Sequence, residues 1–261
     1  LFSALCLGII FRKHLNKIIV LQLFLAAFVS LQLVPDIYKN LTYSDAWKNQ
    51  PDDIETVVLK ERPNIYVIQP DGYASFSELR KPPYNFDNSD FEKFLDDKKF
   101  KLYPEFRSNY FSTLSSNSSM FSMKHHYYNN PNISSNEVYN SRDHIVGENP
   151  VLSILKKNDY KTFLLLHKSY LLVNRPKLAY DYCNIDYSEL SFFARGFNID
   201  KKIEEELAHL INENTTTNNF FFIEQISPGH ISTRKSTSKG VEVERELYLK
   251  KLKEANKWLK N

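Results

Sequence analysis

The chain has 261 residues, 25% of them charged and 42% hydrophobic, with a formal net charge of +3, which is enough for one sizeable domain. A net charge this close to zero, with no basic block interleaved with aromatic residues, gives no support for nucleic-acid binding, and no nucleic-acid partner is predicted. The two cysteines, Cys6 and Cys183, are too few for a disulfide framework or for a zinc site made of cysteines.

Two apolar runs open the chain. Residues 1–11 are too short to cross a bilayer and look like the end of a spanning helix. Residues 18–34 are long enough if flanking side chains reach the interface. The basic residues within 12–17 predict a cytoplasmic loop, so the chain should emerge after residue 34 on the extracytoplasmic side. The sequence therefore predicts transmembrane segments within residues 1–34, in a cytoplasmic (inner) membrane; a buried helical hairpin is the alternative.

The boundaries of the exported part follow from composition. Residues 35–61 are polar and contain Pro51 within a Pro-Asp-Asp run, which is typical of a linker. The chain starts inside an apolar run at Leu1 and stops at Asn261 soon after a charged helical pattern. We therefore expect it to be a fragment of a longer protein.

Three apolar runs predict buried strands of an α/β domain. They lie at residues 64–69, 160–167 and 220–226, and helical patterns occur between them, as in parallel sheets. We expect a mostly parallel central sheet with helices on both faces. The first run should lie at the centre of the sheet, residues 100–106 should return towards it, and the amphipathic pattern of residues 243–260 should pack one face on it.

Polar residues follow two of these strands. Asp71 comes directly after Pro70, which should end the first strand, and Gly72 permits a tight turn. His230 follows the third strand in the run Ser-Pro-Gly-His. Both should lie at the carboxyl edge of the sheet, where α/β proteins bind ligands. Asp71 could hold a cation there or only shape the turn, and His230 could equally be an ordinary loop histidine.

The hydroxyl-rich stretch of residues 108–123 contains the third candidate residue. Its interleaved aromatic and apolar residues predict a turn followed by a helix that begins around Thr113. A hydroxyl and free backbone N–H groups would then lie at a positive helix end, which suits an anion such as phosphate. Thr113 as a helix cap is the alternative, and Ser112 is an alternative for the reactive hydroxyl.

Taken in order, residues 60–261 resemble the alkaline phosphatase/sulfatase superfamily, in the membrane-anchored branch that includes lipoteichoic acid synthases and phosphoethanolamine transferases. The resemblance is carried by these segments: Pro63 to Ile68 leading to Asp71-Gly72, Asn88 to Phe100, Ser108-Asn109-Tyr110 followed by Thr113, and Phe220 to His230. It implies an alkaline phosphatase-like fold in which residues 62–261 are the N-terminal part of an extracytoplasmic catalytic domain.

The same resemblance implies the site. Asp71 matches the first metal-ligating aspartate, Thr113 the nucleophile and metal ligand, and His230 the histidine that contacts the transferred group or substrate. The cofactor would be a divalent metal ion, with Mn²⁺, Mg²⁺, Zn²⁺ and Ca²⁺ left open. The implied activity is metal-dependent transfer or hydrolysis of phosphoryl, phospho-alcohol or sulfuryl groups on a glycan or lipid of the cell envelope.

The sequence departs from the family pattern in two ways. It has no Cys/Ser-x-Pro-x-Arg motif, and the Asp-His pair and further histidine that the family supplies from later strands have no counterpart in this chain. We therefore expect a half-built metal site and an inactive fragment of an active parent protein. The alternative is a non-catalytic, membrane-tethered domain that binds envelope polysaccharide or a protein partner.

Overall fold

A computed structural model describes residues 12–42, 49–50, 52–108, 110–125, 140–191, 199–231 and 238–261. The chain divides into two units, Leu1–Asp45 and Ala46–Asn261. The predicted spanning segment at residues 1–11 and the residue Asn109 lie outside the described residues.

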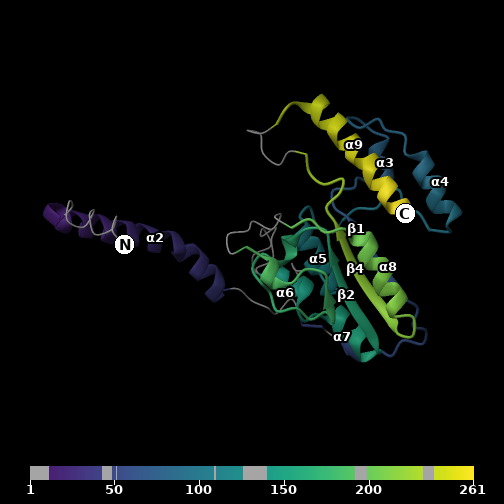
Figure 1. Ribbon diagram of the computed structural model, residues 1–261, viewed down its shortest axis with the longest axis horizontal. Coiled ribbons are helices and arrows are strands. Elements are labelled where there is room, and N and C mark those ends of the chain that lie inside the picture. Colours follow the sequence, from purple (N-terminus) through teal and green to yellow (C-terminus); the bar gives the residue numbers. More distant parts are fainter. Residues whose placement is uncertain are drawn as a thin grey trace. The chain divides into compact units, whose positions relative to one another are not determined.

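The first unit is helical. A 3-10 turn, η1 (Arg12–His14), leads into α2 (Leu15–Thr42), which is seen as the purple helix in Figure 1. Residues 12–38 are long and apolar enough to cross a membrane, a property that signal sequences and buried core helices share. The prediction that a linker begins at residue 35 is wrong, because α2 continues through Pro35 to Thr42. Proline removes one helix hydrogen bond, but apolar helices of this kind often tolerate it.

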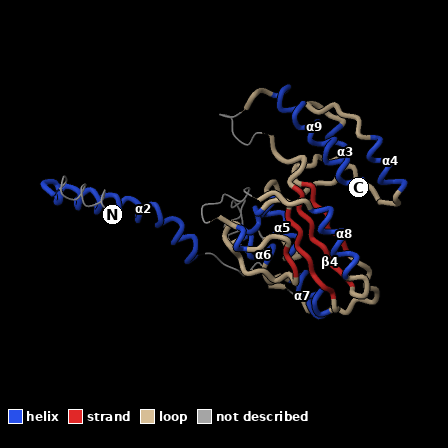
Figure 2. Tube along the Cα trace, viewed as in Figure 1, coloured by secondary structure: helices blue, strands red, loops and turns tan. Residues whose placement is uncertain are grey.

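The second unit contains a four-stranded parallel sheet, drawn in red in Figure 2. Its strands are β1 (Ile65–Pro70), β2 (Tyr160–Leu166), β3 (Tyr182–Cys183) and β4 (Asn218–Gln225), in the order β1-β4-β2-β3. Every pair is parallel. The predicted α/β class and parallel sheet are confirmed.

β1 does not occupy the predicted place. Among the described strands it lies at an edge of the sheet, and its Tyr66 and Ile68 side chains are 40% and 44% exposed. The prediction of a central strand buried on both faces is therefore wrong. β4 and β2 are the central strands, and an apolar run of six residues cannot by itself distinguish an edge from a centre.

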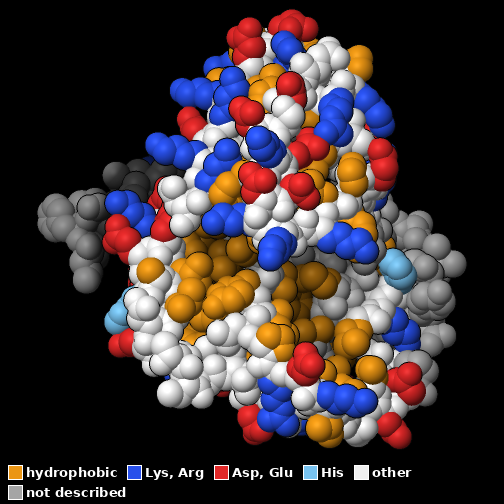
Figure 3. All heavy atoms as spheres, turned by 90° about the vertical axis from the view of Figure 1, so that its right-hand side faces the viewer, with side chains coloured by type: hydrophobic (Ala, Val, Ile, Leu, Met, Phe, Trp, Pro, Cys, Tyr) orange, Lys and Arg blue, Asp and Glu red, His pale blue; other side chains and the backbone are white. Residues whose placement is uncertain are grey.

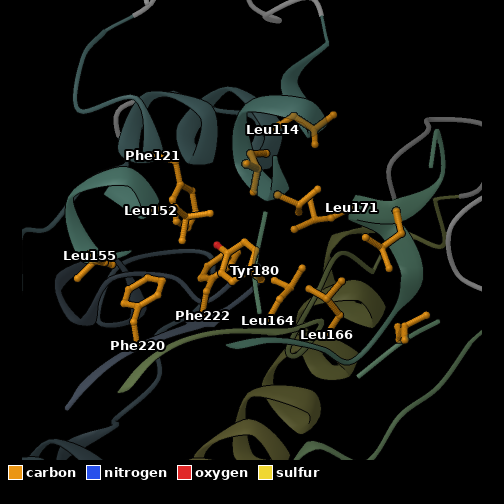
Figure 4. Close-up of a cluster of buried hydrophobic side chains, with 14 of the residues drawn as sticks. Leu114, Phe121, Leu152, Leu155, Leu164, Leu166, Leu171, Tyr180, Phe220 and Phe222 are labelled. Carbon is orange, nitrogen blue, oxygen red and sulfur yellow. The ribbon is translucent and has the colours of Figure 1, made fainter. Parts of the chain in front are cut away.

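Helices cover both faces of the sheet, as predicted. One face packs against α5 (Thr113–Phe121), α6 (Ser141–Val146) and α7 (Pro150–Lys157), and Figure 4 shows Phe220 and Phe222 of β4 within this core. Because side chains alternate along a strand, Phe221 and Ile223 point to the other face, where they pack against α8 (Ile203–Glu213).

A third group of helices has its own small core. It consists of α3 (Phe76–Leu79), α4 (Ser89–Asp97) and α9 (Val241–Lys260), which lie side by side in Figures 1 and 2. Tyr248 and Leu252 of α9 pack against Leu79 of α3, so the prediction that α9 packs on the sheet is wrong for most of its length. Near the end of α9, Trp258 packs against the core between the sheet and α8. Figure 3 shows charges of both signs on this upper part, above a hollow in which hydrophobic side chains gather.

The remaining connections correct two further predictions. Residues 54–59 are not a free linker, since η3 (Ile54–Thr56) is followed by Leu59, whose N–H donates to Asn158 Oδ1 at 2.7 Å. Residues 100–106, which we expected to return towards the sheet, are joined to α3, since the Ser77 N–H donates to Pro104 O at 3.2 Å, and Phe100 and Phe106 face solvent. Two more 3-10 turns are η4 (Ser169–Leu172) and η5 (Tyr187–Glu189).

Candidate functional site

Asp71 lies at the carboxyl edge of the sheet. β1 ends at Pro70, and the Asp71 N–H donates to Gln225 O at 2.8 Å, at the end of the neighbouring β4. The Asp71 side chain is only 13% exposed. Two predictions are confirmed: β1 ends at Pro70, and Asp71 lies at the carboxyl ends of the strands. β1 itself is an outer strand among those described, not a central one.

Two glycines bring the loops after β1 and β4 together. Gly229 N–H donates to Asp71 O at 2.8 Å, and Gly72 has φ +72°, a conformation that favours glycine. A Cβ atom on Gly72 would lie 2.9 Å from Gly229 O. This contact is closer than side chains allow, so the approach of the two loops depends on glycine at position 72.

Thr113 is the first residue of α5, as the sequence predicted. Its hydroxyl donates to Asp71 Oδ1 at 3.0 Å. The neighbouring Ser112 has a different role, because it is the N-cap and its hydroxyl accepts the Ser115 N–H at 3.5 Å. Of the two hydroxyls that the sequence left open, Thr113 is therefore the one that contacts Asp71.

His230 completes the group. Its Nε2 atom lies 3.7 Å from Asp71 Oδ2, and its side chain is 64% exposed. A contact this long and this exposed adds little to stability. It leaves most of the imidazole in solvent, where the ring can meet a ligand. Asp71, Thr113 and His230 are thus brought together from three distant segments of the chain.

A buried polar layer lies beside this edge of the sheet. Gln69 of β1 and Asn117 of α5 exchange two hydrogen bonds of 2.9 and 2.8 Å. Glu224 of β4 pairs with Gln69 in the sheet register and is completely buried. Neither of its carboxylate oxygens has a hydrogen-bond partner among the described residues.

The burial of Glu224 has an electrostatic consequence. Desolvation, followed by the nearby charge of Asp71, raises the Glu224 pKa to about 8, while Arg142 opposes the rise. Glu224 is not among the site residues predicted from the sequence. Its only signal was a single acidic residue inside the apolar run of residues 220–226, a position where an unpaired charge is costly.

The donors can be compared with the divalent cation that the resemblance implies. The Asp71 carboxylate and Thr113 hydroxyl are hard oxygen donors that face each other, and His230 adds an imidazole nitrogen. Within the described ranges, no group of three or more His, Cys, Asp or Glu side chains is placed to hold a metal ion. These donors fit a cation in kind, and they supply part of the coordination shell that such an ion needs.

Comparison of the chain with protein-family models, with curated proteins and with solved structures found no match. The geometry of Asp71, Thr113 and His230 is therefore the basis for the function proposed below.

Proposed function

We propose that Thr113, Asp71 and His230 belong to a site that transfers a phosphoryl, phospho-alcohol or sulfuryl group on a lipid or glycan of the cell envelope. The observation that carries this proposal is the 3.0 Å hydrogen bond from the Thr113 hydroxyl to Asp71, with His230 Nε2 3.7 Å from the same carboxylate. A hydroxyl bonded to a carboxylate at a helix N-terminus is oriented as a nucleophile requires.

In this proposal each residue has a distinct task. The Asp71 carboxylate orients the Thr113 hydroxyl and accepts its proton. Thr113 Oγ1 then forms a bond to the phosphorus or sulfur of the substrate, and the bond from that atom to the leaving alcohol breaks. His230, largely in solvent, contacts the transferred group or protonates the leaving oxygen. Water or an acceptor alcohol finally takes the group from Thr113.

A divalent cation, when bound by Asp71 and Thr113, would favour the deprotonated hydroxyl and offset negative charge on the transferred group. The first turn of α5 would add backbone N–H groups and the positive end of the helix dipole. In this proposal α2 crosses the membrane and the second unit lies on the extracytoplasmic side. The apolar character of residues 12–38 and the basic residues Arg12 and Lys13 at the start of this range support this placement.

The test is turnover of a chromogenic phosphodiester by the full-length protein, with and without added Mn²⁺. Thr113→Ala should lower turnover by several orders of magnitude, as the loss of a nucleophile does. Ser112→Ala is the matched control. It removes the helix cap at a cost of about 1 kcal/mol of stability and should keep most of the turnover.

Undiminished turnover in Thr113→Ala would remove Thr113 from this role. The alternative, a tethered domain that binds envelope polysaccharide or a protein partner without chemistry, predicts a different result. In that case the wild-type protein shows no metal-dependent turnover, and Thr113→Ala retains full polysaccharide or partner binding.

A further inference from the structure

Residues 98–111 lie in the connection between α4 and α5, and their described part, 98–108 and 110–111, has an unusual surface. Four of its aromatic side chains are largely in solvent: Phe100 (60% exposed), Tyr103 (61%), Phe106 (70%) and Phe111 (80%). Single exposed aromatics are ordinary on a soluble surface, but four within one short connection are not. So many exposed aromatic side chains in one segment indicate a surface that contacts something apolar.

The same segment carries positive charge. Lys98, Lys99 and Lys101 are exposed, and Glu105 is its only acidic residue. The Lys101 ammonium lies 5.2 Å from the centre of the Tyr103 ring, so charge and aromatic surface are presented together. Arg107 is already engaged, because it donates to Glu78 at 2.8 Å.

This combination distinguishes between two kinds of apolar partner. The centres of protein–protein interfaces are enriched in aromatic residues but depleted in lysine. At the surface of an anionic bilayer, by contrast, aromatic rings settle at the headgroup level and lysines gain from the negative surface potential. The three exposed lysines therefore favour a lipid surface.

We propose that residues 98–111 bind the headgroup region of an anionic lipid bilayer. The segment ends two residues before Thr113, whose hydroxyl bonds to Asp71. A bilayer held by this segment would therefore bring lipid headgroups to the edge of the candidate site. Only this consequence, a lipid rather than a soluble glycan as substrate, rests on the function proposed above.

The test uses the full chain, with Cys6→Ser and Cys183→Ala, reconstituted into vesicles. Ser108→Cys places an environment-sensitive fluorophore inside the segment and keeps all four aromatic residues. Glu204→Cys places the same label on the exposed surface of α8 as the matched control. Vesicles of phosphatidylcholine alone are compared with vesicles that also contain phosphatidylglycerol, each with a quencher attached to the lipid.

We expect the label at residue 108, but not the label at residue 204, to be quenched, and more strongly with phosphatidylglycerol. Lys98→Ser and Lys101→Ser should each lower the ratio of lipid-bound to free segment by roughly fivefold. The double variant Phe100→Ser, Phe106→Ser should abolish quenching. Because both side chains are exposed, its thermal unfolding should match that of the wild-type protein. Equal exposure of the labels at residues 108 and 204 to water in all vesicles would overturn the proposal. Quenching of the label at residue 108 that is the same with and without phosphatidylglycerol would also overturn it. Because the readout involves no turnover, its failure is distinguishable from failure of the proposed reaction.

Discussion

At the scale of single residues, Gly72 holds the site together. Gly72→Ala should destabilise the fold by about 1–3 kcal/mol and lower any activity that needs Asp71 beside His230, because the new Cβ would meet Gly229 O. Gly240→Ala is a matched control: Gly240 also has positive φ, at +94°, but a Cβ there meets nothing within 4 Å. Both variants strain the backbone at a positive φ, but only Gly72→Ala adds a Cβ that meets another loop, so thermal unfolding of the two separates strain from contact. An equal loss of stability in both would show that the loop contact is unimportant.

Glu224 predicts a pH dependence of stability. Its pKa is about 8 in the folded protein against an ordinary value of 4.5. Between these pH values the folded protein holds a proton that the unfolded chain has lost, so the Glu224 contribution to stability falls as pH rises from about 4.5 to about 8. The slope is at most about 1.4 kcal/mol per pH unit. Glu224→Gln has no proton to lose and should flatten this slope in unfolding experiments across the range.

Asp200→Asn is the control for Glu224→Gln, because the pKa of Asp200 is lowered whereas that of Glu224 is raised. Hydrogen bonding from Lys168 and then from His167 lowers the Asp200 pKa, so its stabilising effect is present above the ordinary pKa and is lost as pH falls. Asp200 is exposed, and its contribution is small. Asp200→Asn should therefore leave the decline between pH 4.5 and 8 unchanged. If Glu224→Gln also left it unchanged, Glu224 would not be its source.

At the scale of elements, a buried ring of polar side chains joins α9 to α4 and to the loop after β1. Tyr73 donates to Asn256 Oδ1 at 2.5 Å, Asn256 donates to Asn88 Oδ1 at 2.7 Å, and Asn88 donates back to the Tyr73 hydroxyl at 2.9 Å. Asn256→Ala removes the acceptor of the Tyr73 O–H and the donor to Asn88 Oδ1, and should cost about 2 kcal/mol in urea unfolding. Lys257→Ala, on the exposed side of the same helix, should change stability by less than about 0.5 kcal/mol. Equal effects of the two substitutions would contradict this role of the ring.

The elements also show what the sequence could and could not predict. β2, β4 and the start of α5 were predictable, because long apolar runs and turn residues determine them locally. The edge position of β1 was not, since it depends on which strand pairs with which. The packing of α9 on α3 was not predictable either, because an apolar stripe on a helix does not determine which surface it packs against. α6 lies in a polar stretch without helical periodicity and was missed.

The candidate site was also predictable only in part. Asp71 and His230 follow strands, so the sheet topology places both at one edge, and Thr113 is the first residue of α5. The contact between Thr113 and Asp71 needed the structure, since the sequence left Ser112 open. The buried Glu224 also needed it, because an acidic residue in a strand gives no sign of which face it occupies or what surrounds it.

At the scale of the whole molecule, α2 should hold the protein in a membrane. If residues 12–38 span a bilayer, the pair Leu25→Arg and Phe28→Arg places two charges near its centre, at about 3 kcal/mol each on insertion scales. The variant should move from the membrane fraction to the soluble or aggregated fraction. Tyr38→Arg, near the helix end, should remain in the membrane because a terminal arginine can reach the interface. Release of the wild-type protein by a salt wash would contradict a spanning helix.

The strand order determines when the site can be assembled during synthesis. Among the described strands β1 is translated first, yet its neighbour is β4, and the Asn219 N–H reaches back 155 residues to Asn64 Oδ1. Contacts between such distant segments form slowly, and an unpaired strand is exposed to aggregation meanwhile. Asp71 is therefore made early but reaches its place beside His230 only after β4 has been translated. A chaperone that shields β1 during that interval should raise the yield of folded protein.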